Sequence, residues 1–485
     1  MRKLLIAAGA VVALAAPGLA RAEASCADLK NTKLAHAEIT AVSKETSGSV
    51  ELCKISVKSH PTKDSDIGIE VWIPIGAGWN GKFVQLGNGG FAGAIGSQQL
   101  KRVAGQGYAT AGTDDGHTAP GTSAAWALGH PEKVVDFGWR ALKETTDISK
   151  ALIRAQKTTG PKNAYFMGCS DGGREALMEA QRYPNDFDGI VAGAPANYMS
   201  RLFALGAGNE QALAKPGGYL DAPALALLQK TALTDCAGGG SYIRDPLACR
   251  FDPGKLLCKP GQSDGCLSAG QVVTARTIYD GHRDPRTGKI VFPGFTPGAE
   301  AQQGGWTTWT TGPNQAANVQ AASYQFSSNA FKYFAFEDPN YDFLKLDLGA
   351  EYDRAQKKMA AVIDSPNPNL GAFRKRGGKL IQYHGWNDPA IPARSSIRYY
   401  EDVRRTMGDT AGFYRMYLVP GMLHCGGGAG PSTVDWLSLL DKWVNEKAAP
   451  GELTATSVSN GSQRLCPYPG VASADGKSCV VKKKS

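Results

Sequence analysis

The chain contains 485 residues, of which 42% are hydrophobic and 20% are charged, and its formal net charge is +9. These proportions are ordinary for a folded soluble protein, and the length is sufficient for roughly two to three domains. No basic run is interleaved with aromatic residues, which argues against nucleic acid as a partner. Beyond the N-terminal residues no stretch approaches twenty apolar residues, so we expect a soluble mature protein that does not bind a membrane.

The first 22 residues have the features of an export signal. Residues 2–3 are positively charged, residues 4–14 form a short apolar run, and residues 20–22 are an A-x-A cleavage site. The apolar run is too short to cross a membrane comfortably, and a buried N-terminal helix is the alternative. We therefore expect residues 1–22 to be a signal peptide and the protein to be secreted, either to the periplasm or outside the cell.

Short apolar runs of strand length alternate with helical patterns along much of the chain. The predicted strands are residues 82–86, 108–112, 163–167, 188–194, 379–383 and 413–419. Apolar residues recur at roughly helical spacing over residues 134–156, and residues 175–182 also predict a helix. Strands that alternate with helices favour the α/β class, in which helices cover a parallel sheet.

The alternation stops near Asn197 and resumes at about residue 377. The stretch between these points is irregular, with four cysteines, many Gly and Pro residues, and a patch that contains Trp306 and Trp309. We interpret residues 199–376 as an inserted domain. Residues 23–198 and 377–485 then form the two halves of the domain that contains the sheet.

Residues 168–172 (GCSDG) fit the motif G-x-S-x-G and lie between a predicted strand and a predicted helix, as this motif requires. In such a turn the Ser hydroxyl stands clear of the sheet, and the flanking glycines remove side chains that would clash. We therefore predict that Ser170 is a nucleophile. The alternative is an ordinary glycine-rich turn.

A serine nucleophile needs an imidazole to accept its proton and a carboxylate to orient that imidazole. In α/β-hydrolases the chain order is Ser, then acid, then His. Three histidines follow Ser170. His282 lies in the irregular stretch, and His384 ends a strand but has no strand-end acid between it and Ser170. These two histidines are therefore weaker candidates than His424.

His424 follows the predicted strand 413–419, and Asp388 follows the predicted strand 379–383. The carboxyl ends of parallel strands are where such sheets place their sites. The order and the positions together predict a Ser170–His424–Asp388 triad. Taken separately, Asp388 is also explained as a turn-capping residue before Pro389, and His424 as a loop histidine.

The ten cysteines are an even number in an exported chain, which favours disulfides, and the absence of a C-x-x-C pair argues against a structural zinc site. The sequence alone does not fix the pairing. Nearest-neighbour pairing gives Cys26–Cys53, Cys236–Cys249, Cys258–Cys266 and Cys466–Cys479, and leaves Cys169 and Cys425 over. If the triad is right, these last two residues are neighbours in space, because each is adjacent to a triad residue. A bridge between them is then expected, and two unrelated buried cysteines are the alternative.

Acyl transfer also needs backbone N–H donors for the developing oxyanion. One donor should be Asp171, the residue after the nucleophile, and the second should come from an early strand-end loop. Residues 87–90 (GNGG) are the best candidate loop, with Gly89 or Gly90 as the donor. A plain glycine turn is the alternative.

Taken together, these residues resemble the tannase and feruloyl esterase family, which also includes bacterial mono(2-hydroxyethyl) terephthalate hydrolase. The matching segments are GNGGFAG (87–93), GTDDGH (112–117), GCSDGGREALMEAQRYPNDFDGIVAGAPA (168–196), ACRFDP (248–253), YHGWNDPAIP (383–392) and VPGMLHCGGG (419–428). The resemblance implies an α/β-hydrolase domain with a large inserted lid, and a bridge between Cys169 and Cys425. It also implies secreted hydrolysis of esters of aromatic acids such as gallate, ferulate or terephthalate monoesters.

The resemblance further implies that the lid supplies an aromatic pocket for the substrate. Residues 331–336 (FKYFAF) are similar to the aromatic lid segment of the family. We therefore expect Phe336 to contact the substrate ring and Lys332 to contact a substrate anion. The alternatives are that Phe336 belongs to the lid core and that Lys332 is a solvated surface residue.

The lid of the family usually carries a calcium loop after its first cysteine, and here the chain departs from that pattern. Cys236 is followed by AGGGS, and only Asp235 and Asp245 lie nearby. Calcium takes six to eight oxygen ligands, several of them from carboxylates. We therefore expect the calcium site to be lost or weak, and we expect no cofactor.

The sequence as a whole predicts a secreted carboxylic ester hydrolase that acts on small aromatic esters through an acyl-enzyme. One alternative keeps the triad but changes the substrate, as in a lipase or a peptidase. The other is a non-catalytic secreted binding protein on the same fold. Nothing in the sequence predicts the oligomeric state.

Overall fold

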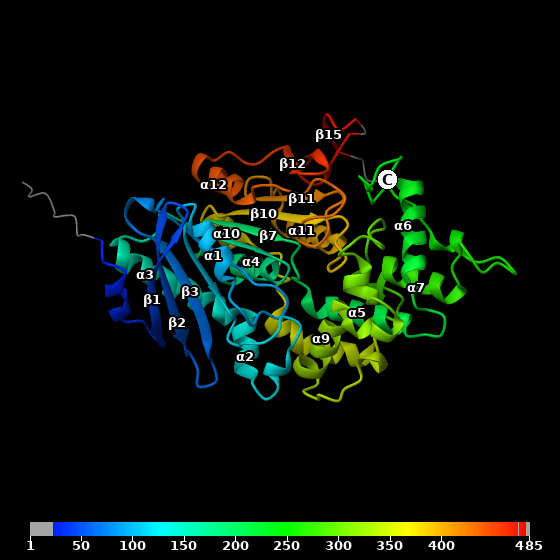
Figure 1. Ribbon diagram of the computed structural model, residues 1–485, viewed down its shortest axis with the longest axis horizontal. Coiled ribbons are helices and arrows are strands. Elements are labelled where there is room, and N and C mark those ends of the chain that lie inside the picture. The colour runs from blue at the N-terminus through cyan, green and yellow to red at the C-terminus, as the bar shows by residue number, and fades with distance from the viewer. Residues whose placement is uncertain (1–22, 474, 482–485) are drawn as a thin grey trace, which may run out of the picture.

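The computed structural model describes residues 23–473 and 475–481, so the predicted signal at residues 1–22 lies outside the described residues. Within that part of the chain, nine strands form one sheet in the order β1-β2-β3-β5-β4-β6-β7-β10-β11 (Figure 1). The strands are β1 (Ala37–Ser47), β2 (Val50–Ser59), β3 (Ile67–Pro74), β4 (Lys82–Leu86), β5 (Ala109–Thr113), β6 (Asn163–Cys169), β7 (Gly189–Gly193), β10 (Lys379–Gly385) and β11 (Tyr414–Val419).

The six strands from β5 to β11 pair in parallel, as the sequence predicts. The three N-terminal strands were not predicted. Strand β1 pairs with β2, β2 with β3 and β3 with β5, and all three pairings are antiparallel. Their connections are short, and no helix lies between them. The alternation of strands and helices that indicates a parallel sheet is therefore missing from this part of the chain.

Helices cover both faces of the sheet because neighbouring residues of a strand point to opposite sides. On β4, for example, Phe83 packs in the cluster with α3 and α4, whereas Val84 packs in the cluster with α1 and α12. The covering helices are α1 (Ser97–Ala104), α3 (Ala141–Lys157), α4 (Asp171–Arg182), α11 (Ala393–Met407) and α12 (Trp436–Glu446), with the short α2 (Pro131–Val135) and α10 (Gly371–Lys375) beside them. Both faces of the parallel strands are buried, which explains why they read as continuous apolar runs.

The chain between β7 and β10 adds no strand to this sheet and lies at one end of it, drawn in green to yellow-green in Figure 1. Besides α10, its α-helices and strands are α5 (Met199–Leu213), α6 (Ala222–Cys236), α7 (Ala269–Asp280), β8 (Gly281–Arg283), β9 (Ile290–Pro293), α8 (Ala322–Asn329) and α9 (Ala350–Ile363). The expectation of an irregular stretch was therefore wrong for these elements. Helix α5 is buried on most of its surface, so it lacks the alternation of apolar and polar faces that indicates a helix.

Five disulfides join all ten cysteines, in the same pairs that nearest-neighbour pairing and the triad argument give. Four of them close short loops, and the Cys169–Cys425 bridge closes a separation of 256 residues. The C-terminal residues form two hairpins, β12 (Leu453–Ser457) with β13 (Gly461–Leu465) and β14 (Gly470–Ala472) with β15 (Cys479–Val481). Among the helices of the described residues, none combines the length and the apolar character needed to span a bilayer.

Candidate active site

Ser170 lies in a sharp turn between the end of β6 and the start of α4. Its backbone has φ 68° and ψ −121°, a conformation that L-residues rarely adopt and that costs about 1–3 kcal/mol. Positions 168 and 173 of this turn require glycine. A Cβ at Gly168 would lie 2.4 Å from Gly172 O, and one at Gly173 would lie 2.2 Å from Gly193 O. The turn therefore has the close backbone approach that a nucleophilic serine at a strand–helix junction requires.

The structure brings His424 and Asp388 together. His424 Nδ1 lies 2.8 Å from Asp388 Oδ2, while Asp388 Oδ1 accepts hydrogen bonds from the backbone N–H groups of Ala390 and Ile391 at 2.8 and 2.9 Å. Asp388 follows the C-terminal end of β10, and His424 follows β11, the neighbouring parallel strand. The carboxylate is therefore fixed by its own turn and can orient the imidazole.

A second imidazole, that of His384, also faces the carboxylate, which sequence reasoning did not foresee. His384 Nε2 lies 3.2 Å from Asp388 Oδ2 and 2.9 Å from Ile391 O, and its Nδ1 lies 2.7 Å from Ser396 Oγ. Burial alone would raise the pKa of the Asp388 carboxyl. The charge of His424 and the hydrogen bonds from both imidazoles outweigh burial and hold this pKa below its usual range.

We expect Asp388→Asn to lower kcat for an aryl ester by about 10⁴-fold, because an amide no longer holds His424 in the tautomer that accepts a proton. The variant should also be less stable than the wild type at pH 7. Since the pKa of Asp388 is depressed in the folded state, its carboxylate stabilises the fold above the pKa of the unfolded chain, and this contribution is lost as the pH falls toward the folded pKa.

Steady-state kinetics and urea unfolding at neutral and acidic pH test this prediction. The stability difference between wild type and variant should narrow at acidic pH. A kcat within about tenfold of the wild type would contradict the orienting role of Asp388.

The Cys169–Cys425 bridge ties the turn that contains Ser170 to the loop that contains His424. The two Cα atoms are 5.9 Å apart, and each cysteine is adjacent in sequence to Ser170 or His424. Within residues 23–473 and 475–481, no hydrogen bond joins Ser170 Oγ to His424, and such contacts often tighten only when substrate is bound. The bridge thus keeps the backbones of Ser170 and His424 close together, and bound substrate would complete the alignment of their side chains.

The oxyanion candidates lie on two sides of Ser170. Asp171 is the first residue of α4, where a backbone N–H has no partner within the helix. Gly90 lines the pocket that contains Ser170, whereas Gly89 does not. Gly90 has φ 63°, and a Cβ there would lie 2.4 Å from Gly121 O, so only glycine fits without movement. The geometry thus favours Gly90 over Gly89.

Helix α4 holds this glycine loop in place. Glu175 Oε2 accepts a hydrogen bond from Asn88 N–H at 2.9 Å, and Gly172 N–H donates to Asn88 O at 2.8 Å. The same helix therefore carries the Ser170 turn and positions the loop with the second candidate donor. These contacts join residues far apart in the chain, so no local sequence pattern predicts them.

Three buried carboxylates, Asp115, Asp171 and Glu175, lie within 4.8 Å of one another beneath this loop. Burial and then the charge of Asp171 raise the pKa of Glu175 to about 7, and burial with the charge of Glu175 raises the pKa of Asp115 well above its usual range. Arg174, also fully buried, donates to the Asp171 carboxylate from within the cluster. The Asp171 carboxylate therefore forms an ion pair with Arg174.

The loop between Cys236 and Cys249, where the family's calcium loop would lie, offers few carboxylates. Within residues 23–473 and 475–481, the three carboxylates above are the only group of three or more Asp, Glu, His or Cys side chains with metal-ligand spacing. None of them comes from the loop between Cys236 and Cys249. In that region Asp235 pairs instead with Lys255 at 2.8 Å.

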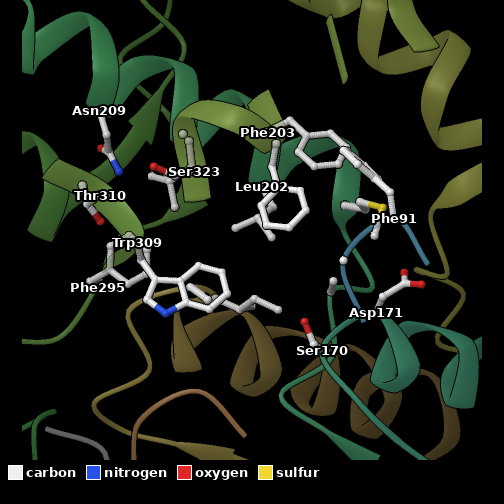
Figure 2. A pocket seen from close by; sticks show the side chains of 18 residues that line it. Phe91, Ser170, Asp171, Leu202, Phe203, Asn209, Phe295, Trp309, Thr310 and Ser323 are labelled. Atoms are coloured by element: carbon white, nitrogen blue, oxygen red, sulfur yellow. The ribbon is translucent and has the colours of Figure 1, made fainter. Parts of the chain in front are cut away.

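A largely apolar pocket opens at Ser170 between the sheet and the inserted helices (Figure 2). Aromatic rings on its walls come from Phe91, Phe203, Phe295, Trp309 and Phe326. The Trp309 ring also meets the His424 ring edge to face, with the ring centres 4.9 Å apart. Most of this wall comes from the segment between β7 and β10, where only Trp309 stands out from the sequence, without a predicted role.

Phe336 and Lys332 are not brought to this pocket, and neither is among the residues that line it. The Phe336 ring packs instead against Tyr341 at 4.2 Å and Phe331 at 6.4 Å, in the apolar cluster of the inserted segment. The aromatic segment was assigned by its resemblance to the family's lid segment, but its π-helical turn directs Phe331 and Phe334 into that cluster. The expected substrate contacts of Phe336 and Lys332 therefore have no support in the geometry.

Comparisons with known proteins agree with this architecture. The family model described as "Tannase and feruloyl esterase" matches residues 53–485. An uncharacterized esterase of Xanthomonas campestris pv. campestris is 34% identical over 93% of this chain and 88% of its own length. A probable feruloyl esterase B-2 of Aspergillus terreus is 30% identical over 87% of this chain and 83% of its own.

The crystal structure of feruloyl esterase B from Aspergillus oryzae superposes with a TM-score of 0.85 at 25% identity, covering 94% of this chain and 100% of that one. Tannin acyl hydrolase from Aspergillus niger, at 24% identity and a TM-score of 0.71, shares the fold over 94% of this chain and 95% of its own. The molecule is thus an α/β-hydrolase. The chain belongs to the tannase and feruloyl esterase family and is a carboxylic ester hydrolase.

Proposed function

We propose that this chain is a secreted serine esterase for esters of aromatic, phenolic acids, with Ser170, His424 and Asp388 as its triad. The observation that carries the proposal is the 2.8 Å contact between His424 Nδ1 and Asp388 Oδ2, next to a bridge that ties His424 to the Ser170 turn. The relatives described as feruloyl esterases support the substrate class. The five disulfides and the signal-like residues 1–22 support secretion.

The proposed reaction has two steps. His424 Nε2 accepts the Ser170 proton while Oγ attacks the ester carbonyl, and Asp388 stabilises the resulting imidazolium. The protonated imidazole then gives its proton to the leaving alcohol, and the acyl group stays on Ser170. Water that loses a proton to His424 attacks this acyl-enzyme, and the aromatic acid is released.

The negative charge on the carbonyl oxygen would be held by backbone donors. The N–H of Asp171 is one, and that of Gly90 is the other, with Gly89 as the adjacent alternative. Fixed donors of this kind strengthen their hydrogen bonds in the transition state at no cost in reorganisation. No metal ion or cofactor takes part in the proposed steps.

The apolar, ring-lined pocket favours a small aromatic ester over the two alternative substrate types. A peptide would leave backbone N–H and C=O groups unpaired against apolar walls, which is costly. A long aliphatic ester would lose the ring contacts that Phe203, Phe295 and Trp309 offer. A non-catalytic binding protein would not need the strained Ser170 turn.

A substrate panel tests the proposal. Purified protein is assayed with methyl ferulate, methyl gallate, a terephthalate monoester, a long-chain aliphatic ester and a peptide, each with and without EDTA. We expect the highest kcat/KM on one of the aromatic esters and no loss on chelation, since the loop after Cys236 offers few carboxylates for calcium. Preference for the peptide or the aliphatic ester would refute the substrate class, and loss of activity in EDTA would refute metal independence.

A further inference from the structure

The pocket at Ser170 has a polar end that the proposed reaction does not use. Figure 2 shows Asn209, Ser323 and Thr310 together at the end remote from Ser170, with the aromatic walls between. Polar groups that close an otherwise apolar pocket fix the orientation of a ligand and select among ligands. The chemistry of these groups therefore bears on which ring substituents the pocket accepts.

Asn209 carries a buried acceptor without a partner. The residue lies on α5 and is 2% exposed, and its Oδ1 accepts no hydrogen bond from any residue in the described part of the chain. A buried polar atom left unpaired costs free energy, so most such atoms in folded proteins are paired. An unpaired amide oxygen on the wall of a pocket is therefore suited to a donor on the ligand.

Ser323 is arranged to present an acceptor as well. Its Oγ–H donates to Glu210 Oε1 at 2.8 Å, which leaves lone pairs of Oγ for a ligand. Glu210 also accepts from Asn318 Nδ2 at 3.3 Å and is fully buried. Burial raises the pKa of Glu210 to about 8, and the hydrogen bonds from Ser323 and Asn318 oppose this rise.

This end of the pocket lacks a positive charge. Among the described residues that line the pocket there is no Lys or Arg, and the one charged residue, Asp171, is paired with Arg174 beneath the turn. A carboxylate on the substrate ring would lose its hydration here and find no cation, which is strongly unfavourable. A neutral hydroxyl would find acceptors.

We propose that Asn209, assisted by Ser323, forms a subsite that binds a neutral hydroxyl donor on the ring of the aromatic acyl group. The inference rests on the proposed function, because it places the ring in the pocket next to Ser170. It makes Asn209 a specificity-determining residue. The subsite selects phenolic acyl groups over unsubstituted rings and over rings that carry a carboxylate.

The test compares ring substituents within one enzyme preparation. Methyl 4-hydroxycinnamate, methyl cinnamate and the monomethyl ester of 4-carboxycinnamic acid are assayed with wild type, Asn209→Leu, Ser323→Ala and the control Ser327→Ala. Ser327 is a buried serine on the same helix as Ser323 and is not among the residues that line the pocket, and its Oγ–H donates to the backbone O of Phe203. Ratios of kcat/KM are used because they do not depend on the fraction of folded protein.

The wild type should prefer the 4-hydroxy ester over methyl cinnamate by about tenfold or more, and should act on the carboxylated ester more slowly than on either. Asn209→Leu should reduce the first ratio to about one while activity on methyl cinnamate persists, Ser323→Ala should reduce it in part, and Ser327→Ala should leave it unchanged. An unchanged ratio in Asn209→Leu, or a wild-type preference for the carboxylated ester, overturns the subsite. Failure of the proposed function is a separate result, namely no turnover of any of the three esters by the wild type.

Discussion

Ser170→Ala is expected to lower kcat for methyl ferulate or a comparable aryl ester by on the order of 10⁶-fold, the size of loss seen when a serine-hydrolase nucleophile is removed. The proposed mechanism passes through an acyl group on Ser170 Oγ, and alanine has no atom to carry it. The residual rate would come from the backbone donors and the pocket alone. Steady-state and single-turnover assays measure this loss directly.

The stability of the variant distinguishes a chemical defect from a folding defect. Alanine retains the Cβ of serine, so the strain of φ 68° at position 170 is unchanged and the free energy of unfolding should stay near the wild-type value. Ser170→Gly should be equally inactive but more stable by about 1 kcal/mol, because glycine adopts this conformation without a Cβ clash. Inactive but stable alanine and glycine variants would together identify Ser170 as the reacting residue.

A fluorophosphonate probe gives an independent readout. The wild type should be labelled at the peptide that contains Ser170, and the alanine variant should not be labelled. Turnover that survives in Ser170→Ala, or probe attached to another serine, would contradict the proposed mechanism. It would also revive the alternative that the fold serves a different reaction or none.

The proposed triad could be inferred from the sequence because Ser170, Asp388 and His424 each follow a strand of the parallel sheet. Strands such as β6 and β10 are short apolar runs, and a run of this kind identifies the strand end without any tertiary information. The order Ser, acid, His then leaves few choices for the remaining residues. The motif around Ser170 could be recognised because its serine and glycines form a pattern within five residues, although the clash that excludes a side chain at Gly173 involves Gly193 on β7.

The pocket could not be predicted in the same way, since its walls depend on packing between distant segments. Phe91 follows β4, Asn209 lies on α5, and Trp309 lies in a turn about 100 residues later, and no local pattern relates them. The resemblance to the family's lid segment suggested Phe336 instead, but its ring packs against Tyr341. Whether an aromatic residue faces a cavity or a core is decided by tertiary contacts, which periodicity does not encode.

The contacts of Glu175 also depend on packing between distant segments, although Glu175 itself lies in a recognised motif. The residue lies in the segment GCSDGGREALMEAQRYPNDFDGIVAGAPA, which sequence reasoning singled out, yet its partners Asn88 and Asp115 come from other strand ends. A charged side chain on a predicted helix reads as solvated surface until the covering loop is known. Such buried polar contacts become visible only with the three-dimensional arrangement.

Removal of the Cys169–Cys425 bridge is the second large effect that we expect. The double variant Cys169→Ala/Cys425→Ala should lose about 5 kcal/mol of unfolding free energy, because the bridge closes a separation of 256 residues and restricts the unfolded chain accordingly. Alanine keeps a Cβ at both positions, so the backbone at Cys425, with φ 62°, meets the same steric demand as before. Denaturant unfolding under non-reducing conditions measures the loss, with the other four bridges intact.

The matched control is Cys258→Ala/Cys266→Ala, which removes a bridge across only 8 residues and should cost about 2–3 kcal/mol by the same chain-entropy argument. The two variants should also differ in activity. Loss of the long bridge frees the backbone on both sides of the Ser170–His424 pair, and a misplacement of about 1 Å can lower kcat by on the order of 10²-fold. Loss of the short bridge, on the remote part of the inserted segment, should leave kcat unchanged. Equal stability losses in the two variants would contradict the entropic account. An unchanged kcat without the long bridge would mean that strands β6 and β11 alone hold the nucleophile and the base in register.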